Sequence, residues 1–254
     1  MALSRLMKKK KHKRQPTFKN ASSPTTAIQS LPKDMLEKVV ARVASHSFTD
    51  LHNMKMCCRD FLDASEDSYV WQNVSLDKFP LIQWFPNDTS FFFLKRCKQN
   101  GNIESVWRDG FLEFFCHPNG NIGGLEILKV ASEKGHMEAK YMYGMILLCS
   151  EDDELRKEGL EHMRFLRKSM CVIACRKKVA QFAKHLWINR ALVRNQSPLC
   201  RHTSTCNGWG LKKGRWILLD KDDDNFDSCE YCRWDHELKF FYKLFNVTQY
   251  TFYE

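Results

Sequence analysis

Four cysteines near the C-terminus have residue types and spacings that could together hold a metal ion. They are Cys200, Cys206, Cys229 and Cys232. The C-x2-C spacing of the second pair delivers two sulfurs to one ion, whereas the first pair is spaced more widely than is usual in structural zinc sites. His202 and His236 are alternative ligands. A structural zinc is therefore a candidate cofactor; the alternative is a core of reduced thiols packed with Trp209, Trp216 and Trp234.

The chain lacks the common motifs of catalytic and nucleotide-binding sites. We find no G-x-x-x-x-G-K-[ST] or G-x-G-x-x-G loop for phosphates, no G-x-S-x-G nucleophile turn and no H-E-x-x-H zinc-protease motif. The run Asp222–Asp224 lacks the spaced ligands and the glycine of a calcium loop, which indicates a solvated acidic turn. We therefore expect a protein that is not an enzyme and has no cofactor other than the candidate zinc.

The positive charge of the chain lies mostly in its first residues. The sequence has 40 basic and 30 acidic residues, but nine of the basic ones and none of the acidic ones fall between Met1 and Lys33. The rest has a net charge of only +1, which argues against a nucleic-acid-binding fold. The eleven cysteines are odd in number, no apolar run follows the basic start, and no segment is long and apolar enough to span a membrane. We expect a reducing, intracellular environment and no membrane partner.

Residues 1–29 form a polar, basic tail that we expect to be disordered. Pro16, Pro24 and several serines and threonines leave too little apolar surface to offset the entropy of ordering. The run Lys8–Arg14 fits a nuclear-import signal, so we expect a nuclear protein that also has access to the cytoplasm. The alternative is a basic tail that only increases solubility.

Residues 30–76 have the pattern of a small helical domain. Leu31-Pro32 places proline at the first turn of a helix, where its missing N–H costs nothing. Apolar residues then recur at three- and four-residue spacing: Met35, Leu36, Val39, Val40 and Val43. Ser47 to Asp50 provides polar caps for a second helix, and Val70, Trp71 and Val74 close the segment. We expect three helices.

Residues 79–169 contain an internal repeat. The stretch Gly101–Gly110 aligns with Gly135–Gly144 at an offset of 34 residues, with glycine, glutamate, an aromatic residue and glycine in the same places. This offset is the period of tetratricopeptide-type helix pairs. We therefore expect a short array of helical repeats, which stack into surfaces that hold peptides or partner proteins.

Residues 170–254 are segregated by charge. Between His162 and Leu219 there are thirteen basic residues and no acidic one, and eight acidic residues follow between Asp220 and Glu237. One interpretation is a basic helix facing an acidic loop of the same domain, and the other is an acidic partner docked on the basic face. The residues around Trp216 have the pattern of a β-strand, so we expect a helix and a small Cys-rich module with some β structure. The fold class is mostly α.

The segment from Leu31 to Val74 resembles an F-box. The resemblance rests on Leu31-Pro32, Cys57-Cys58-Arg59 and the late Val70-Trp71, which have the order and spacing of that family. With the glycine-rich repeat downstream, the chain is similar to a plant F-box group that bears Sel-type repeats, which are relatives of the tetratricopeptide repeat.

This resemblance implies a protein–protein interaction role in the ubiquitin-conjugation pathway. F-boxes of this type dock on the Skp-type adaptor of a cullin-RING ubiquitin ligase, while the downstream domain captures a target. By analogy, the residues expected to contact the adaptor are Leu31, Pro32, Met35, Leu36 and Val39, while Leu51 and Trp71 are expected to serve both the contact and the core. The target is an unknown protein. Two rival interpretations are a nuclear zinc-module protein that binds nucleic acid and an F-box scaffold that degrades nothing.

Overall fold

The part of the chain that the structure describes is entirely helical. The computed structural model describes residues 31–81, 87–116, 122–184, 197–201 and 229–245. These ranges contain eleven α-helices and no β-strand, which confirms the mostly α fold class. None of these helices combines the length and the apolar character that crossing a membrane requires.

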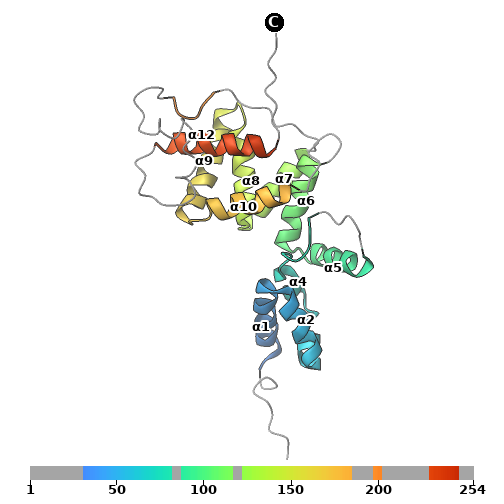
Figure 1. Ribbon diagram of the computed structural model, residues 1–254. Helices are drawn as coiled ribbons and strands as arrows, with labels where there is room; N and C mark the ends of the chain where they lie inside the picture. Colours follow the sequence, from blue (N-terminus) through green and yellow to red (C-terminus); the bar gives the residue numbers. More distant parts are fainter. Residues whose placement is uncertain (1–30, 82–86, 117–121, 185–196, 202–228, 246–254) are drawn as a thin grey trace, which may run out of the picture.

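Short helices form the N-terminal end of the molecule (Figure 1). They are α1 (Lys33–His46), α2 (Phe48–Cys57), α3 (Arg59–Ser65) and α4 (Ser68–Asn73). The sequence predicts three helices in this region, and the structure has four because the extended backbone of Cys58 separates α2 from α3. Ser47 caps α2 as expected, since its Oγ accepts a hydrogen bond of 3.1 Å from the backbone N–H of Asp50.

One hydrophobic core joins these four helices to α5 (Asp88–Gln99). Its buried side chains include Leu36, Val40, Leu51, Val70, Trp71 and Cys97. The rings of Phe48, Phe79 and Phe93 pack beside this core with centroids 4.8–5.0 Å apart. The helix that follows the predicted F-box therefore belongs to the same packing unit.

The predicted repeat corresponds to two consecutive helix pairs. Helix α6 (Ile103–Phe115) packs against α7 (Ile122–Glu133), and α8 (Met137–Leu148) packs against α9 (Asp153–Lys168). Gly101 and Gly135, which are 34 residues apart, have φ angles of 76° and 92° just before α6 and α8. Glycine is the residue that adopts this left-handed conformation without strain, so the repeated glycines mark the repeated turn.

The two copies also share their hydrogen bonds. The backbone N–H of Asn102 donates to the carbonyl of Cys97, and that of His136 donates to the carbonyl of Ala131 in the same way. The side chains of Asn102 and His136 then cap α6 and α8. A Cβ atom at Gly144 would lie 3.0 Å from the Cβ of His162, so this glycine lets α8 approach α9 closely. Helical-repeat packing is confirmed.

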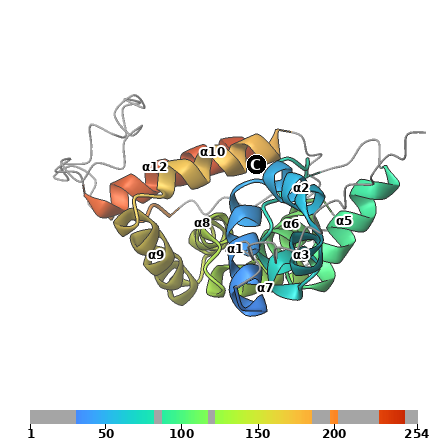
Figure 2. The same ribbon diagram turned by 90° about the horizontal axis from the view of Figure 1, so that it is seen from below.

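The C-terminal helices cover one side of this array. In Figure 2, α10 (Val172–Ala183) and α12 (Glu230–Leu244) run along the same side of it. Trp234 and Phe241 of α12 are buried in one core with Trp107 of α6. The described part of the predicted C-terminal module therefore shares its core with the repeats. The expected strand around Trp216 and the basic tail lie outside the described residues.

Candidate functional site

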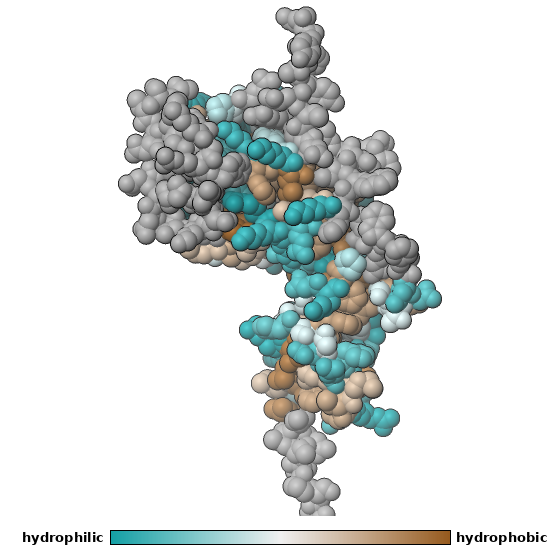
Figure 3. All heavy atoms as spheres, viewed as in Figure 1, coloured by the Kyte–Doolittle hydropathy of each residue, from teal (hydrophilic) through white to brown (hydrophobic). Residues whose placement is uncertain are grey.

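The residues expected to contact an adaptor fall into two groups. Leu31, Pro32, Met35 and Val39 are exposed; the exposed fractions of the residues Leu31, Met35 and Val39 are 41%, 46% and 46%. Residues four apart lie on one face of a helix, so Met35 and Val39 form a stripe along α1 that continues to Leu31 at its N-terminal end. Figure 3 shows apolar side chains at the surface of this end of the molecule. We call these four residues the apolar stripe.

The other three expected contact residues are buried inside the domain. Leu36, Leu51 and Trp71 are core residues of the N-terminal helices. They support α1 from within, whereas the apolar stripe faces outward. The periodicity of the sequence identified an apolar helix, but it did not distinguish the inner face of α1 from the outer one.

Two cations and a carboxylate fix the indole ring of Trp71. The Nζ atom of Lys55 lies 4.8 Å from the ring centroid, and the guanidinium carbon of Arg96 lies 4.3 Å from it. Glu66 pairs with both cations. Burial alone would raise the pKa of Glu66, but the hydrogen bond from Lys55 and the two positive charges lower it below its usual value. Helix α5, which carries Arg96, is thereby bound to the N-terminal helices.

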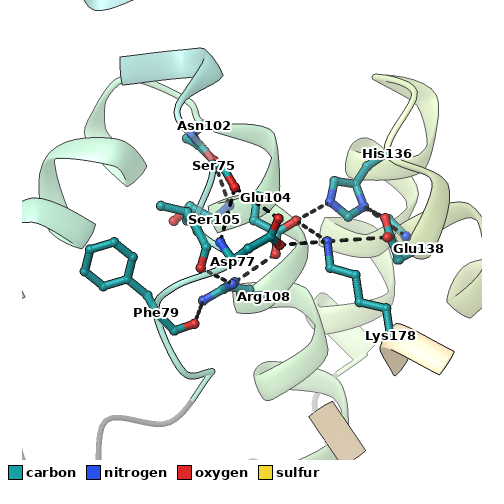
Figure 4. Close-up of polar contacts among 12 residues, drawn as sticks. Ser75, Asp77, Phe79, Asn102, Glu104, Ser105, Arg108, His136, Glu138 and Lys178 are labelled. Carbon is teal, nitrogen blue, oxygen red and sulfur yellow. Dashed lines mark hydrogen bonds and ion pairs between the residues drawn. The ribbon is translucent and has the colours of Figure 1, made fainter. Parts of the chain in front are cut away.

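A buried polar junction connects the N-terminal helices to the repeats. The Asn102 side-chain amide donates hydrogen bonds to the carbonyls of Trp71 at 3.0 Å and Val74 at 2.9 Å. The Arg108 guanidinium donates to the carbonyls of Leu76 and Phe79, both at 2.8 Å. Both donors are on or next to α6, so the segment that leaves α4 is tied directly to the first repeat (Figure 4).

Glu104 is the centre of this junction. Its carboxylate accepts hydrogen bonds from Arg108 Nε at 3.0 Å, His136 Nε2 at 2.8 Å and Lys178 Nζ at 3.2 Å. His136 Nδ1 accepts the backbone N–H of Ala139, which leaves the ring proton on Nε2 for Glu104. Burial raises the pKa of this carboxyl, but the hydrogen bond from His136 and the nearby cations outweigh it and lower the pKa to about 2.

The polar junction joins helices and has the character of a structural site. Lys178 on α10 also pairs with Glu138 at 3.4 Å and with Asp77 at 3.5 Å, so one cation links three segments of the chain (Figure 4). Each drawn charge faces a partner of opposite sign, and no serine or cysteine nucleophile hydrogen-bonds to His136 in the described chain. Such an arrangement holds the N-terminal helices at a fixed angle to the repeats.

Sequence reasoning identified only part of this junction. Glu104 and Glu138 recur at the 34-residue offset, and Asn102 and His136 occupy the same repeat position. That recurrence was the available signal for a repeated cap. The contact of Lys178 with Glu104 joins residues 74 positions apart, and no local pattern predicts it.

Three of the four predicted metal ligands lie together. The Sγ atoms of Cys200, Cys229 and Cys232 all lie within 4.8 Å of one another, and those of Cys200 and Cys229 are 3.9 Å apart. Cys229 occupies the N-cap position of α12, so the C-x2-C pair spans the first turn of this helix. This cysteine cluster could hold a metal ion. Its members do not include His236, and Cys206 and His202 lie outside the described residues.

A carboxylate brings Cys200 to the cluster from a distant part of the sequence. The two oxygens of Asp235 on α12 accept the backbone N–H groups of Leu199, at 2.7 Å, and of Cys200, at 3.0 Å. These two hydrogen bonds hold Leu199 and Cys200 against α12. The spacing of the cysteines alone gave no sign of this clamp.

Comparisons with known proteins identify the family. Residues 76–184 match the family model described as plant tetratrico peptide repeats. The Arabidopsis thaliana protein At1g67623, whose recorded name describes it as an F-box protein, is 30% identical over 227 residues, which cover 84% of this chain and 75% of that protein. The chain belongs to the plant F-box proteins with tetratricopeptide-like repeats.

Two further relatives of this F-box protein are similar over shorter stretches. The Arabidopsis thaliana F-box protein At2g35280 is 26% identical and the match covers 55% of this chain and 85% of that protein. The F-box protein At1g67340 of the same plant is 25% identical over 47% of this chain and 32% of its own length. No solved structure matches the chain. The predicted family is confirmed.

Proposed function

We propose that this F-box protein is a substrate-recognition adaptor of an SCF-type ubiquitin ligase, which consists of a Skp-type adaptor, a cullin and an F-box protein. The apolar stripe would bind the Skp-type adaptor, and the adaptor would connect it to the cullin. The repeats and the C-terminal helices would bind an unknown target protein. Family membership supports a non-catalytic adaptor role.

The observation that carries the proposal is the exposure of the apolar stripe. The four apolar residues of the stripe, two in α1 and two just before it, face solvent, while Leu36 and Val40 on the other face of α1 fill the core. Clustered apolar side chains on a surface mark interaction sites more often than single ones do. The polar junction supports the same role, because a bridging protein must hold its two binding ends at a defined distance for proximity to raise the rate of ubiquitin transfer.

A pull-down with a purified Skp-type adaptor tests the proposal. We expect Leu31→Ala/Pro32→Ala to lose most of the complex, because both side chains would lie at the contact. Thermal unfolding of the same variant should match the wild type, since both residues are exposed. Undiminished capture of this folded variant would contradict the proposed interface.

We also propose that the cysteine cluster binds a structural zinc ion, with Cys206 as the fourth ligand. Zinc–sulfur bonds of about 2.3 Å in a tetrahedron place the sulfurs about 3.8 Å apart, and the Cys200 and Cys229 sulfurs are separated by a similar distance, 3.9 Å. The backbone clamp of Asp235 would act as the outer support that ligands of such sites commonly have. The ion would bind Cys200 to the start of α12 and so stabilise this end of the molecule.

Metal analysis of the full-length protein tests the zinc proposal. We expect about one equivalent of zinc, lost in Cys229→Ser/Cys232→Ser. The matched control is Cys57→Ser/Cys58→Ser, because these cysteines are exposed and belong to α2 and its end. Zinc-free protein that unfolds at the same temperature with and without a chelator would contradict the proposal.

We further propose that the basic run Lys8–Arg14 directs the protein to the nucleus. A fluorescent fusion in which these basic residues are changed to glutamine should lose nuclear accumulation. Retention of the wild-type distribution would contradict this location signal.

A further inference from the structure

A small cavity lies beside the cysteine cluster, away from the polar junction. It has a volume of about 330 Å³ and is bounded by α9, by residues 197–201 and by the first turn of α12. One wall is therefore the segment that Asp235 holds against α12. Nothing in the adaptor-binding role of the apolar stripe uses this cavity.

The charged side chains around the cavity are mostly cations. Arg156, Lys157 and Arg201 line it, against the single acid Asp153. Asp153 pairs with Arg201 at 3.8 Å, but both side chains are largely exposed, and such pairs are weak. The lining therefore carries an excess of positive charge that a bound anion could neutralise.

Arg156 is the unusual member of this group. Only 8% of its surface is exposed, and its Nη2 atom donates to the carbonyl of Ser197 at 2.9 Å. Its Nε atom has no hydrogen-bond partner, and no carboxylate within the described chain pairs with its guanidinium. A buried charge without a counter-charge is costly, because the desolvation of the ion is not offset by an ion pair.

Two other arginines with largely buried side chains are paired with carboxylates of the chain. Arg108 pairs with Glu104 at the polar junction, and Arg176 pairs with Glu237 on α12. In both cases a carboxylate from the same chain neutralises the guanidinium. The absence of such a carboxylate at Arg156, in the described residues, points to an anion that comes from a ligand.

The remaining wall of the cavity is apolar. Leu160 of α9, Leu199 and Pro198 line it together with Tyr231 at the start of α12. An inorganic anion has no apolar group to pack against this wall. A peptide with an acidic side chain would also bring neighbouring apolar side chains into contact with it. Guanidinium groups bind carboxylates and phosphates through paired N–H groups, so both anions fit.

We propose that this cavity binds an acidic side chain of the target protein, either a carboxylate or a phosphorylated serine or threonine, together with an adjacent apolar residue. The inference rests on the proposed adaptor function and names the chemical class of target segment that the C-terminal side recognises. Arg156 and its neighbours would hold the anion, and Leu160 and Tyr231 would contact the apolar residue.

Binding of synthetic peptides to the full-length protein tests the inference. The probes are short fluorescent peptide pools that contain glutamate, phosphoserine, glutamine or lysine at a central position, flanked by mixed apolar residues. We expect the glutamate or the phosphoserine pool to bind at least about tenfold more tightly than the glutamine and lysine pools, as a charge-assisted hydrogen bond implies. The two acidic pools distinguish carboxylate from phosphate.

Variants of the cavity supply the decisive comparison. Arg156→Met and Lys157→Gln/Arg201→Gln should each weaken the acidic pools about tenfold or more. The matched control Lys168→Gln/Lys184→Gln removes the same charge from exposed positions that do not line the cavity, and it should bind as the wild type does. Equal losses in the control would overturn the inference, because general attraction to a basic protein would then explain the binding.

Two further outcomes would also overturn the inference. One is equal binding of all four pools. The other is binding that appears only in Asp222→Asn/Asp223→Asn/Asp224→Asn, because the cavity would then hold the chain's own acidic run. A pull-down of the Skp-type adaptor with the same proteins separates the cavity inference from the proposed function. The cavity variants should bind the adaptor as the wild type does. If the wild type binds the acidic peptides but not the adaptor, the proposed function fails and the cavity inference still holds.

Discussion

The polar junction and the cavity beside α9 differ in whether their positively charged side chains pair with carboxylates of the described chain. At the junction, Arg108 and Lys178 each pair with Glu104, and every partner comes from the chain itself. At the cavity, Arg156 is equally buried, but its guanidinium donates to the backbone carbonyl of Ser197 and pairs with no carboxylate of the described residues. The first arrangement stabilises the fold. The second is the arrangement on which the proposed anion site rests.

Removing the central carboxylate should have the largest effect on the fold. Glu104→Gln leaves the buried Arg108 without a carboxylate partner and leaves the half-buried Lys178 with only Glu138 and Asp77, so we expect the free energy of unfolding to fall by about 3–5 kcal/mol. Chemical denaturation measures this loss. The exposed Glu151→Gln is the control and should stay within about 0.5 kcal/mol of the wild type. A small loss for Glu104→Gln would mean that the junction is not a structural site.

The same carboxylate should make stability depend on acid pH. A carboxyl whose pKa is lower in the folded protein than in the unfolded chain stabilises the fold above the unfolded value, and this stabilisation is lost as the pH falls through the folded value. For Glu104 the window runs from its usual pKa of 4.5 down to about 2. The stability difference between wild type and Glu104→Gln should therefore shrink by about 3 kcal/mol across it. A difference that is constant with pH would contradict the assignment.

Substituting the two arginines should sharpen the comparison directly. Arg108→Met loses two hydrogen bonds to carbonyls and one cation beside Glu104, so we expect a loss of about 3 kcal/mol in unfolding free energy. Arg156→Met loses one hydrogen bond but also removes an unpaired buried charge, and the change should stay within about 1 kcal/mol. Equal losses of unfolding free energy in the two variants would contradict the difference between a paired arginine at the junction and an unpaired one at the cavity.

The smallest effect on stability is expected at the apolar stripe. Met35→Ala/Val39→Ala removes side chains that are nearly half exposed, so the free energy of unfolding should change by no more than about 0.5 kcal/mol for each. Leu36→Ala, on the inner face of the same helix, should cost about 2–5 kcal/mol. Thermal or chemical denaturation distinguishes the two faces of α1, and similar losses would contradict their assignment.

The sequence predicted the elements better than it predicted their contacts. The spacing of apolar residues in α1 and the recurrence of glycine at an offset of 34 residues are local signals. Both correspond to helices in the structure. The choice between Met35 and Leu36 as the outward residue depends on which face packs against α4, which spacing alone does not determine. Pairs such as Lys178 with Glu104 and Arg156 with Ser197 join distant segments, so only the packed fold reveals them.

The cysteine cluster combines a pair that the sequence predicted with a contact between distant residues that it did not. The C-x2-C pair could be read from its spacing because both sulfurs lie on one helical turn. The contribution of Cys200 depends on the clamp by Asp235, which is 35 residues away in the sequence. The spacing of Cys200 in the sequence therefore did not predict that it lies beside Cys229 and Cys232.

Titration of a purified Skp-type adaptor into the wild type and into Met35→Ala/Val39→Ala tests the central claim most directly. The exposed pair Val130→Ala/Met170→Ala, outside the N-terminal helices, is the matched control. Our account predicts that the stripe variant stays folded and binds at least about tenfold more weakly, while the control binds as the wild type does. Equal affinity of the wild type and the stripe variant, or no binding by the wild type, would contradict the account.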